Sequence, residues 1–276
     1  MSSVADADGI AARSGLELAN DNAAALWLGR AAAHGWQTAS GPAWTAVRCE
    51  GPAEGAHRVL LTRAPADPGA LTAELLELFR RWDTRALHLE DPYRVLDLSR
   101  HGCEAALPAA VMVRQAAGAG AESEPRTPVP TGEVQVHEAG AEPQLADVER
   151  VVVQGFPLPS RLPWHRGAQF PPEAMARCGP ALRQWLALRH GTPAGACLSW
   201  DDGAAVGLYY VAVLPEHRGR GVGRTLVRAV LDAHPGRAAV LTATLLGEPL
   251  YRRLGFREVG TSVWWRFPGT PQALRS

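Results

Sequence analysis

The sequence contains no lysine and no excess of charge of either sign. Its 28 basic residues are all arginines, and 28 acidic residues balance them to a formal net charge of zero. A general nucleic-acid binder carries a basic excess that neutralises phosphates, so we expect no nucleic-acid partner. We attribute the missing lysine to GC-rich codon usage, and note that arginine suits bidentate contacts to phosphate.

Long apolar runs, cysteine pairs and metal-ligand spacings are also missing. No apolar run approaches the roughly 18 residues of a membrane span, and the acidic start, MSSVADADG, lacks the layout of a signal peptide. No C-x-x-C pair occurs among the cysteines, which favours buried thiols in a reducing compartment over disulfides or zinc ligands. We therefore expect a cytoplasmic protein with no membrane partner and no metal. The cysteines are Cys49, Cys103, Cys178 and Cys197.

The most informative stretch runs from Val211 to Leu231, VAVLPEHRGRGVGRTLVRAVL. An apolar run ends at Pro215, a glycine-rich turn follows, and apolar residues then recur at helical spacing. A helix that begins in this way offers unpaired N–H groups to an anion, and glycines let the backbone approach it closely. Arginines at the turn suit phosphate oxygens. The segment predicts a diphosphate-binding loop made of Arg218, Gly219, Arg220, Gly221, Gly223 and Arg224.

A linker divides the chain into two units. Residues 116–132, AAGAGAESEPRTPVPTG, are small, polar and rich in proline and glycine. We expect one domain over residues 16–115 and a second over residues 133–268. A disordered tail is expected at residues 1–15, and a second tail at residues 269–276.

Periodicity predicts strands and helices in both units. In the first, helices are expected at 16–33, 70–82 and 95–101, and strands at 44–49, 58–62, 86–90 and 110–114. In the second, strands are expected at 134–137, 182–189, 194–200, 204–213, 238–244 and 259–267, and helices at 145–153, 222–231 and 248–254. Residues 156–172 are expected to form a loop. The fold class is α/β (α+β), with a mixed sheet.

The ends of the two units resemble each other. The first ends in LSRHGCEAALPAAVMVR and the second in LYRRLGFREVGTSVWWR. In each, a helical segment meets a glycine and leads into an apolar strand that ends in arginine. This similarity indicates an internal duplication.

The second unit resembles the GCN5-related N-acetyltransferase (GNAT) superfamily over about residues 133–267. Two blocks carry the resemblance. The first is Arg-x-x-Gly-x-Gly at Arg218, Gly221 and Gly223, directly after a strand. The second is the segment 250–256, LYRRLGF, which is similar to the family's Tyr-x-x-x-Gly-Phe. The resemblance implies a mostly antiparallel sheet with splayed central strands, flanked by helices.

The resemblance also implies acetyl-CoA as co-substrate and direct transfer of its acetyl group to a primary amine. The amine of a small molecule or of a peptide N-terminus would attack the thioester, and a base or a water chain must first remove a proton from an ammonium whose pKa is near 10. Tyr251 matches the family's general-acid tyrosine, and a phenol can donate a proton. The implied cofactor contacts are Val211, Ala212, Val213, Arg218, Gly219, Arg220, Gly221, Val222, Gly223, Arg224 and Thr244.

The sequence departs from the family at two positions. Some members carry a glutamate on the strand before this tyrosine, where Ala239 stands here, and a cofactor-contacting asparagine where Thr244 stands. No other residue in the second unit is a convincing base. The available titratable residues all fit turns, and are Asp201, Asp202, Glu216, His217 and Glu248.

The first unit resembles a degenerate copy of the same fold, as in tandem members of the family. It has no Arg-x-x-Gly-x-Gly, and Leu98 stands where Tyr251 stands in the second unit. We therefore expect the catalytic domain to be C-terminal. The alternative is a non-catalytic acyl-CoA-binding sensor, which the missing glutamate motivates. The acceptor and the oligomeric state stay open.

Overall fold

The computed structural model describes residues 13–50, 57–82, 86–116, 133–156, 158 and 161–267. The expectations for residues 1–12, 117–132 and 268–276, which cover most of the linker and both tails, lie outside these ranges. The domain boundaries drawn from them stay predictions.

The N-terminal half begins with a long helix, α1 (Gly15–His34), whose ends are fixed by local chemistry. Ser14 and Glu17 form a capping box at its start, and Gly35 ends it in the left-handed conformation. The elements that follow are β1 (Gln37–Gly41), β2 (Trp44–Arg48), β3 (His57–Leu61), α2 (Pro68–Arg81), β4 (Leu87–Asp91), the 3-10 turn η1 (Ser99–His101), β5 (Glu104–Ala105) and β6 (Ala109–Arg114).

The C-terminal half starts with a strand. Its segment Val211–Leu231 forms the end of one strand, a 3-10 turn and most of a helix. Its elements are β7 (Val134–Glu138), α3 (Glu142–Gly155), α4 (Pro172–Arg177), η3 (Gly179–Ala181), β8 (Leu182–Arg189), β9 (Thr192–Asp201), β10 (Ala205–Val213), η4 (Pro215–His217), α5 (Val222–Ala233), β11 (Ala238–Ala243), α6 (Glu248–Arg253) and β12 (Arg257–Phe267).

The described strands form one continuous sheet in the order β1-β2-β3-β4-β12-β6-β11-β10-β9-β8-β7, with β5 beside β12. Two neighbouring pairs are parallel, β3 with β4 and β10 with β11, and the others are antiparallel. In both cases a helix, α2 or α5, connects the two parallel strands. The expected mixed, mostly antiparallel sheet flanked by helices is confirmed.

The last strand of each half lies in the sheet of the other half. β12 pairs with β4, Trp265 opposite Leu89, and β6 pairs with β11, Met112 opposite Leu241. β12 and β6 also pair with each other, which joins the halves at the centre of the sheet. These two strands are the ends whose sequences resemble each other. Because each completes the opposite half, neither half has a complete sheet of its own.

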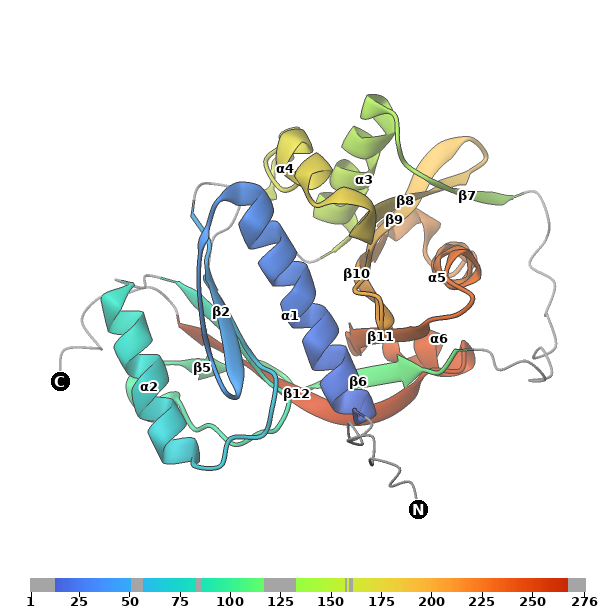
Figure 1. Ribbon diagram of the computed structural model, residues 1–276. Helices are drawn as coiled ribbons and strands as arrows, with labels where there is room; N and C mark the ends of the chain where they lie inside the picture. Colours follow the sequence, from blue (N-terminus) through green and yellow to red (C-terminus); the bar gives the residue numbers. More distant parts are fainter. Residues whose placement is uncertain are drawn as a thin grey trace, which may run out of the picture.

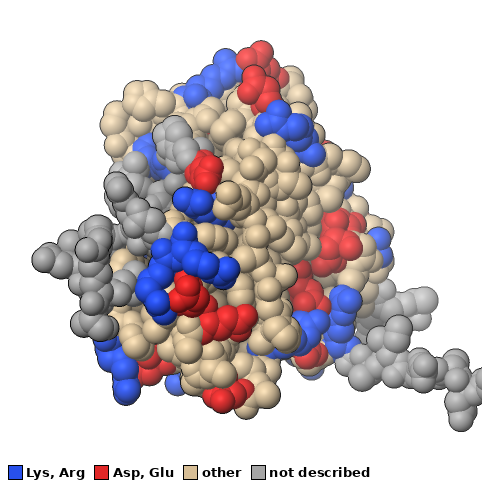
Figure 2. Space-filling view, turned by 60° about the vertical axis from the view of Figure 1, so that its left-hand side comes forward, with Lys and Arg blue, Asp and Glu red and all other residues tan. Residues whose placement is uncertain are grey.

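Helices cover both faces of the sheet. α5 and α6 pack on one face of the C-terminal half through Leu226, Val230 and Tyr251, and α3 packs on the other through Val148 and Val152. α1 runs between the halves on the same face as α3 (Figure 1), where Ala19 meets residues of β6, β10 and β11. On the face shown in Figure 2, arginines lie beside acidic residues, with uncharged residues between these groups.

The predicted helices and strands agree with the structure except in four segments, one of which is the two-residue strand β5, which was not expected. β1 and the short helix α4 were not expected. The helix expected over residues 95–101 is wrong apart from the single turn η1, because the buried carboxylate of Asp91 accepts the N–H groups of Tyr93, Arg94, Val95 and Leu96 at 2.7–3.1 Å. These bonds fold the chain into a tight turn in place of the first helical turn.

Candidate active site

The parallel strands β10 and β11 separate before they end. Their pairing runs only from Ala205 opposite Ala238 to Gly207 opposite Val240. β10 continues to Val213 and β11 to Ala243, and β11 stays paired with β6 on its other side. The diverging segments therefore open a wedge in the sheet, where backbone groups of β10 have no partner strand on the side of β11. Val211, Ala212 and Val213, expected to bind the cofactor, lie on this part of β10.

A β-bulge shapes β10 at the start of the wedge. The register with β9 shifts between Tyr209 and Ala212, and Tyr210 has φ of +52°, which is uncommon for a residue with a side chain. Such bulges are over-represented next to active sites, where they re-aim side chains. The bulge turns the ring of Tyr210 toward Phe156 and Phe170, at centroid distances of 5.9 and 5.4 Å.

Asn22 of α1 holds the bulge from the N-terminal half. Its fully buried amide donates to the carbonyl oxygens of Trp200 (3.2 Å) and Ala205 (3.1 Å), and its oxygen accepts from the Tyr209 hydroxyl at 2.7 Å. Gly207 makes this approach possible, because a Cβ there would collide with Asn22 Oδ1. The geometry of β10 at the wedge therefore depends on α1.

The predicted diphosphate loop leads from β10 through η4 into α5. Gly221 stands at the N-cap in the left-handed conformation (φ +81°), and no side chain caps the helix. The first intrahelical bond runs from Thr225 N–H to the Gly221 carbonyl, 3.0 Å. The N–H groups of Val222, Gly223 and Arg224 precede it, so they have no carbonyl one helical turn earlier. They form the kind of helix N-terminus that binds anions.

The equivalent helix of the N-terminal half has its N-terminus closed by the chain itself. α2 also connects two parallel strands, but its N-cap residue Asp67 accepts from Gly69 N–H at 2.8 Å and from Ala70 N–H at 3.0 Å. A carboxylate already occupies the place where a phosphate would bind. The capped and uncapped helices distinguish the two halves as candidate diphosphate sites.

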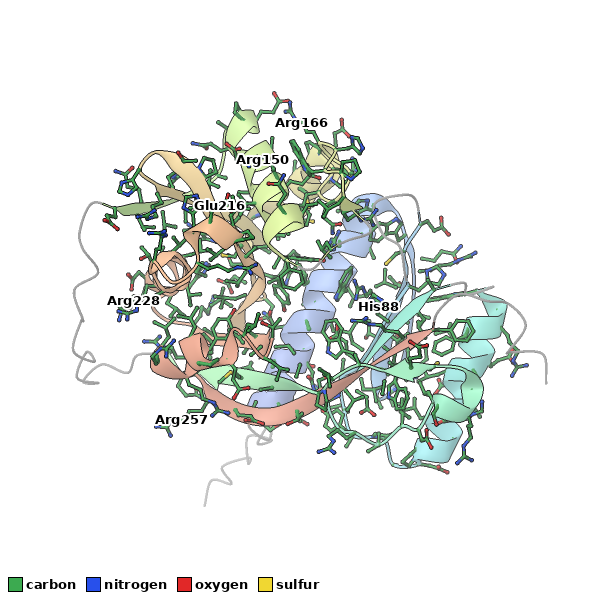
Figure 3. The ribbon with its side chains drawn as sticks, turned by 180° about the vertical axis from the view of Figure 1, so that it is seen from behind. His88, Arg150, Arg166, Glu216, Arg228 and Arg257 are labelled. Atoms are coloured by element: carbon green, nitrogen blue, oxygen red, sulfur yellow. The ribbon has the colours of Figure 1, made fainter. Side chains whose placement is uncertain are left out.

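The arginines of the loop have different surroundings. Arg218 donates to the carbonyl oxygens of Val213 (3.2 Å) and Gly155 (3.1 Å), so it ties the loop to β10 and to the end of α3. Arg220 is exposed and donates to the Glu216 carbonyl at 3.3 Å. Arg224 is partly exposed on the first turn of α5. Figure 3 labels Glu216 before α5, and Arg228, which points outward from α5.

Tyr251 lies on α6, next to the diphosphate loop. Its neighbour Leu250 reaches the first turn of α5, where a Cβ on Gly223 would lie 3.3 Å from Leu250 Cδ2. The two sequence blocks that carry the family resemblance are thus brought together. The Tyr251 ring is buried and packs edge-on against Phe256. Burial raises the pKa of Tyr251, and nearby Cys197 adds to this effect, so the phenol keeps its proton at neutral pH.

The other residues considered in the sequence analysis make contacts within the protein. The Thr244 hydroxyl accepts from Gly247 N–H at 3.2 Å and keeps its own proton free to donate. Ala239 is fully buried in the core beneath α5. The turn interpretation is confirmed for two of the acidic candidates: Asp201 accepts the Gly203 N–H group at 2.9 Å, and Asp202 accepts the Ala204 and Ala205 N–H groups. Glu248 instead begins helix α6 and pairs with Arg252.

A small cavity lies at the start of the wedge, between the two halves. Its volume is about 30 Å³, and α1, β3, β4, β6, β10, β11 and β12 line it. Glu90 of β4 and Tyr209 of β10 face it from opposite halves of the chain. Glu90 is not among the predicted site residues, because the alternation in LHLED places it opposite Leu87 and Leu89, on a face expected to meet solvent. Residues of α1, β10 and β11 cover that face in part, so Glu90 is only partly exposed.

Comparison with known proteins also indicates an acetyltransferase fold in the C-terminal half. Residues 180–258 match the model of the acetyltransferase (GNAT) domain. The search of curated proteins finds no match. No helix among the described residues is long and apolar enough to cross a membrane, and these residues contain no cluster of metal-ligating side chains.

Solved structures share the fold at low sequence identity. A GCN5-related N-acetyltransferase from Kribbella flavida has 18% identity and a TM-score of 0.63, with 97% of this chain and 99% of that chain covered. One from Sphaerobacter thermophilus has 18% identity and a TM-score of 0.58, covering 84% and 79%. A tandem GNAT protein from the clavulanic acid biosynthesis pathway has 17% identity and a TM-score of 0.52, covering 81% and 77%. The chain has the GNAT fold, and the domain match supports acyl transfer as its general chemistry.

Proposed function

We propose that the protein transfers the acetyl group of acetyl-CoA to a primary amine, and that the C-terminal half carries the site. The observation that supports this most is the uncapped N-terminus of α5, directly after the wedge between β10 and β11. In the N-terminal half, Asp67 fills the corresponding helix N-terminus. We therefore propose that the N-terminal half is a degenerate tandem copy that binds no acyl-CoA and contributes α1 and β6.

The residues present fit acetyl-CoA along its length. The N–H groups of residues 219–224 would bind the diphosphate, with Arg220 and Arg224 supplying charge. The backbone of Val211, Ala212 and Val213 would bind the pantetheine arm in the wedge, and the Thr244 hydroxyl, directly after β11, can donate to the cofactor.

Tyr251 would assist the departure of the thiolate. Because its phenol keeps its proton, it can donate a hydrogen bond or a proton to the sulfur as the carbon–sulfur bond breaks. The attack itself needs no covalent intermediate with the protein. The acceptor is proposed to be a small-molecule amine or a peptide N-terminus.

The experiment compares Gly221→Asp with Gly221→Asn by calorimetric titration with acetyl-CoA. Aspartate and asparagine tolerate the left-handed conformation alike, so the pair differs only in charge. A unit charge 4 Å from another is worth about 1 kcal/mol in water and about 4 kcal/mol at an effective dielectric constant of 20. We expect Gly221→Asp to bind acetyl-CoA at least about tenfold more weakly than Gly221→Asn. Equal affinities would exclude the diphosphate assignment.

A non-catalytic acyl-CoA sensor is the second candidate, because the apolar, buried Ala239 occupies the position where some family members carry a glutamate. Thiol release from acetyl-CoA in the presence of a mixed amine library distinguishes the two. Saturable binding without release for any amine would favour the sensor.

A further inference from the structure

The cavity at the start of the wedge joins polar groups from both halves of the chain. Its polar lining consists of Asn20 from α1, Glu90 from β4, Tyr209 from β10, Thr242 from β11 and Ser262 from β12. None of these residues belongs to the two blocks of the family resemblance. The C-terminal half supplies no base at the position of Ala239, so these groups need an explanation of their own.

The cavity adjoins the open part of the wedge. β11 pairs with β10 only as far as Val240, and the next two residues, Leu241 and Thr242, both line the cavity. Thr242 is exposed although it lies on a central strand, so the cavity is accessible beside the separated strands. Under the proposed function, the thioester lies in this wedge and therefore next to the cavity.

Two of these polar groups, the buried Ser262 and the partly exposed Glu90, have few partners among the described residues. Ser262 is 2% exposed, and its hydroxyl oxygen has no hydrogen-bond partner among the described residues. Among the described residues, Arg58 of β3 is the one charge that lowers the pKa of Glu90. The Tyr209 hydroxyl donates to Asn22, which leaves its oxygen free to accept. Buried polar groups are normally hydrogen-bonded, and these acceptors match a donor with several N–H groups.

We propose that this cavity receives the amino group of the acceptor and that the Glu90 carboxylate accepts its proton. This rests on the proposed function. An amino group is about the size of a water molecule, which a cavity of about 30 Å³ accommodates. The substrate class is a primary aliphatic amine whose remaining part leaves the cavity on the side of Thr242.

The proton balance is complete with these residues. Glu90 takes one proton from the acceptor's ammonium group and frees the nitrogen lone pair. The carbon–nitrogen bond then forms and the carbon–sulfur bond breaks, while Tyr251 donates a proton to the sulfur. The second proton leaves the nitrogen for solvent, and Tyr251 regains a proton from solvent. Glu90 releases its proton to solvent, so ammonium and thioester become amide, thiol and one free proton.

The charge environment suits Glu90 to this role. Burial raises the pKa of Glu90 from 4.5 to about 7, against an opposing effect of Arg58. A base is most effective when its pKa lies near the working pH. Other titratable groups near Glu90 among the described residues include Tyr209, whose pKa burial also raises, and His88, which stays neutral because burial lowers its pKa to about 3. Arg266 of β12 lies opposite His88 and also lowers the pKa of His88. Figure 3 labels His88 two residues before Glu90 on β4.

The test measures thiol release from saturating acetyl-CoA between pH 5.5 and 9, with methylamine as the acceptor probe. Glu90→Gln should lower the rate about 100-fold or more near pH 8 and remove the inflection near pH 7. Its affinity for acetyl-CoA should stay within twofold of wild type. Glu104→Gln, an exposed position in the same half, is the matched control and should change neither quantity.

Glu90→Asp serves as a second variant, because it keeps a titrating carboxyl but withdraws it by one methylene. It should lose rate while retaining the inflection, which a purely structural role for Glu90 would not produce. An unchanged rate and pH profile in Glu90→Gln would overturn the inference. So would a wild-type protein that binds acetyl-CoA yet releases no thiol with methylamine. Absence of acetyl-CoA binding in wild type would instead refute the proposed function itself.

Discussion

Replacing Glu90 by glutamine should change how the stability of the protein depends on pH. In the folded protein burial raises the pKa of Glu90 from 4.5 to about 7. Between these values the unfolded chain has lost the proton that the folded chain keeps, so rising pH lowers stability through this window. The whole difference corresponds to about 3 kcal/mol, of which about 2 kcal/mol falls between pH 5 and pH 8.

The free energy of unfolding, measured with urea at pH 5 and pH 8, tests this value in wild type and in Glu90→Gln. The advantage of the variant over wild type should grow by about 2 kcal/mol from pH 5 to pH 8. Other titrating groups, including His88, are shared by both proteins and cancel in the comparison. The exposed Glu104→Gln control should show no such growth. Parallel pH dependences for wild type and Glu90→Gln would mean that Glu90 titrates as an ordinary exposed carboxyl.

Two further predictions concern the catalytic and the structural roles of the two halves. Tyr251→Phe should reduce turnover while acetyl-CoA affinity measured by calorimetry stays nearly unchanged, and an unaltered turnover would remove the proton-donor role. Deletion of residues 1–117 removes β6 from between β11 and β12 and exposes strand edges, so the remaining chain should be insoluble on expression. A soluble fragment with wild-type acetyl-CoA affinity would contradict the structural role of the N-terminal half.

The local elements of the fold were largely predictable because each obeys a short-range rule. The apolar spacing after Gly221 predicts α5, the alternating residues of β4 predict a strand, and so does the short apolar run of β10. The helix α4 was not predicted because prolines surround it. The turn after β4 was not predicted because it depends on one buried carboxylate, that of Asp91. Neither feature leaves a periodic signal in the sequence.

The candidate site was predictable only where its residues are close in sequence. The diphosphate loop and Tyr251 belong to two compact blocks. Asn22, Glu90 and Tyr209 meet through pairings that span more than one hundred residues, and the exchange of β6 and β12 sets these pairings. The similar tails indicated a duplication, but nothing in them showed that each would complete the other half's sheet.

A crystal structure with acetyl-CoA soaked in would test the central claim most directly. The diphosphate should lie on the N–H groups of residues 219–224, and the acetyl group should lie between β10 and β11, beside the cavity that Glu90 and Tyr209 line. Diphosphate density at the N-terminus of α2, or an acetyl group remote from this wedge, would contradict the assignment of the active site to the C-terminal half.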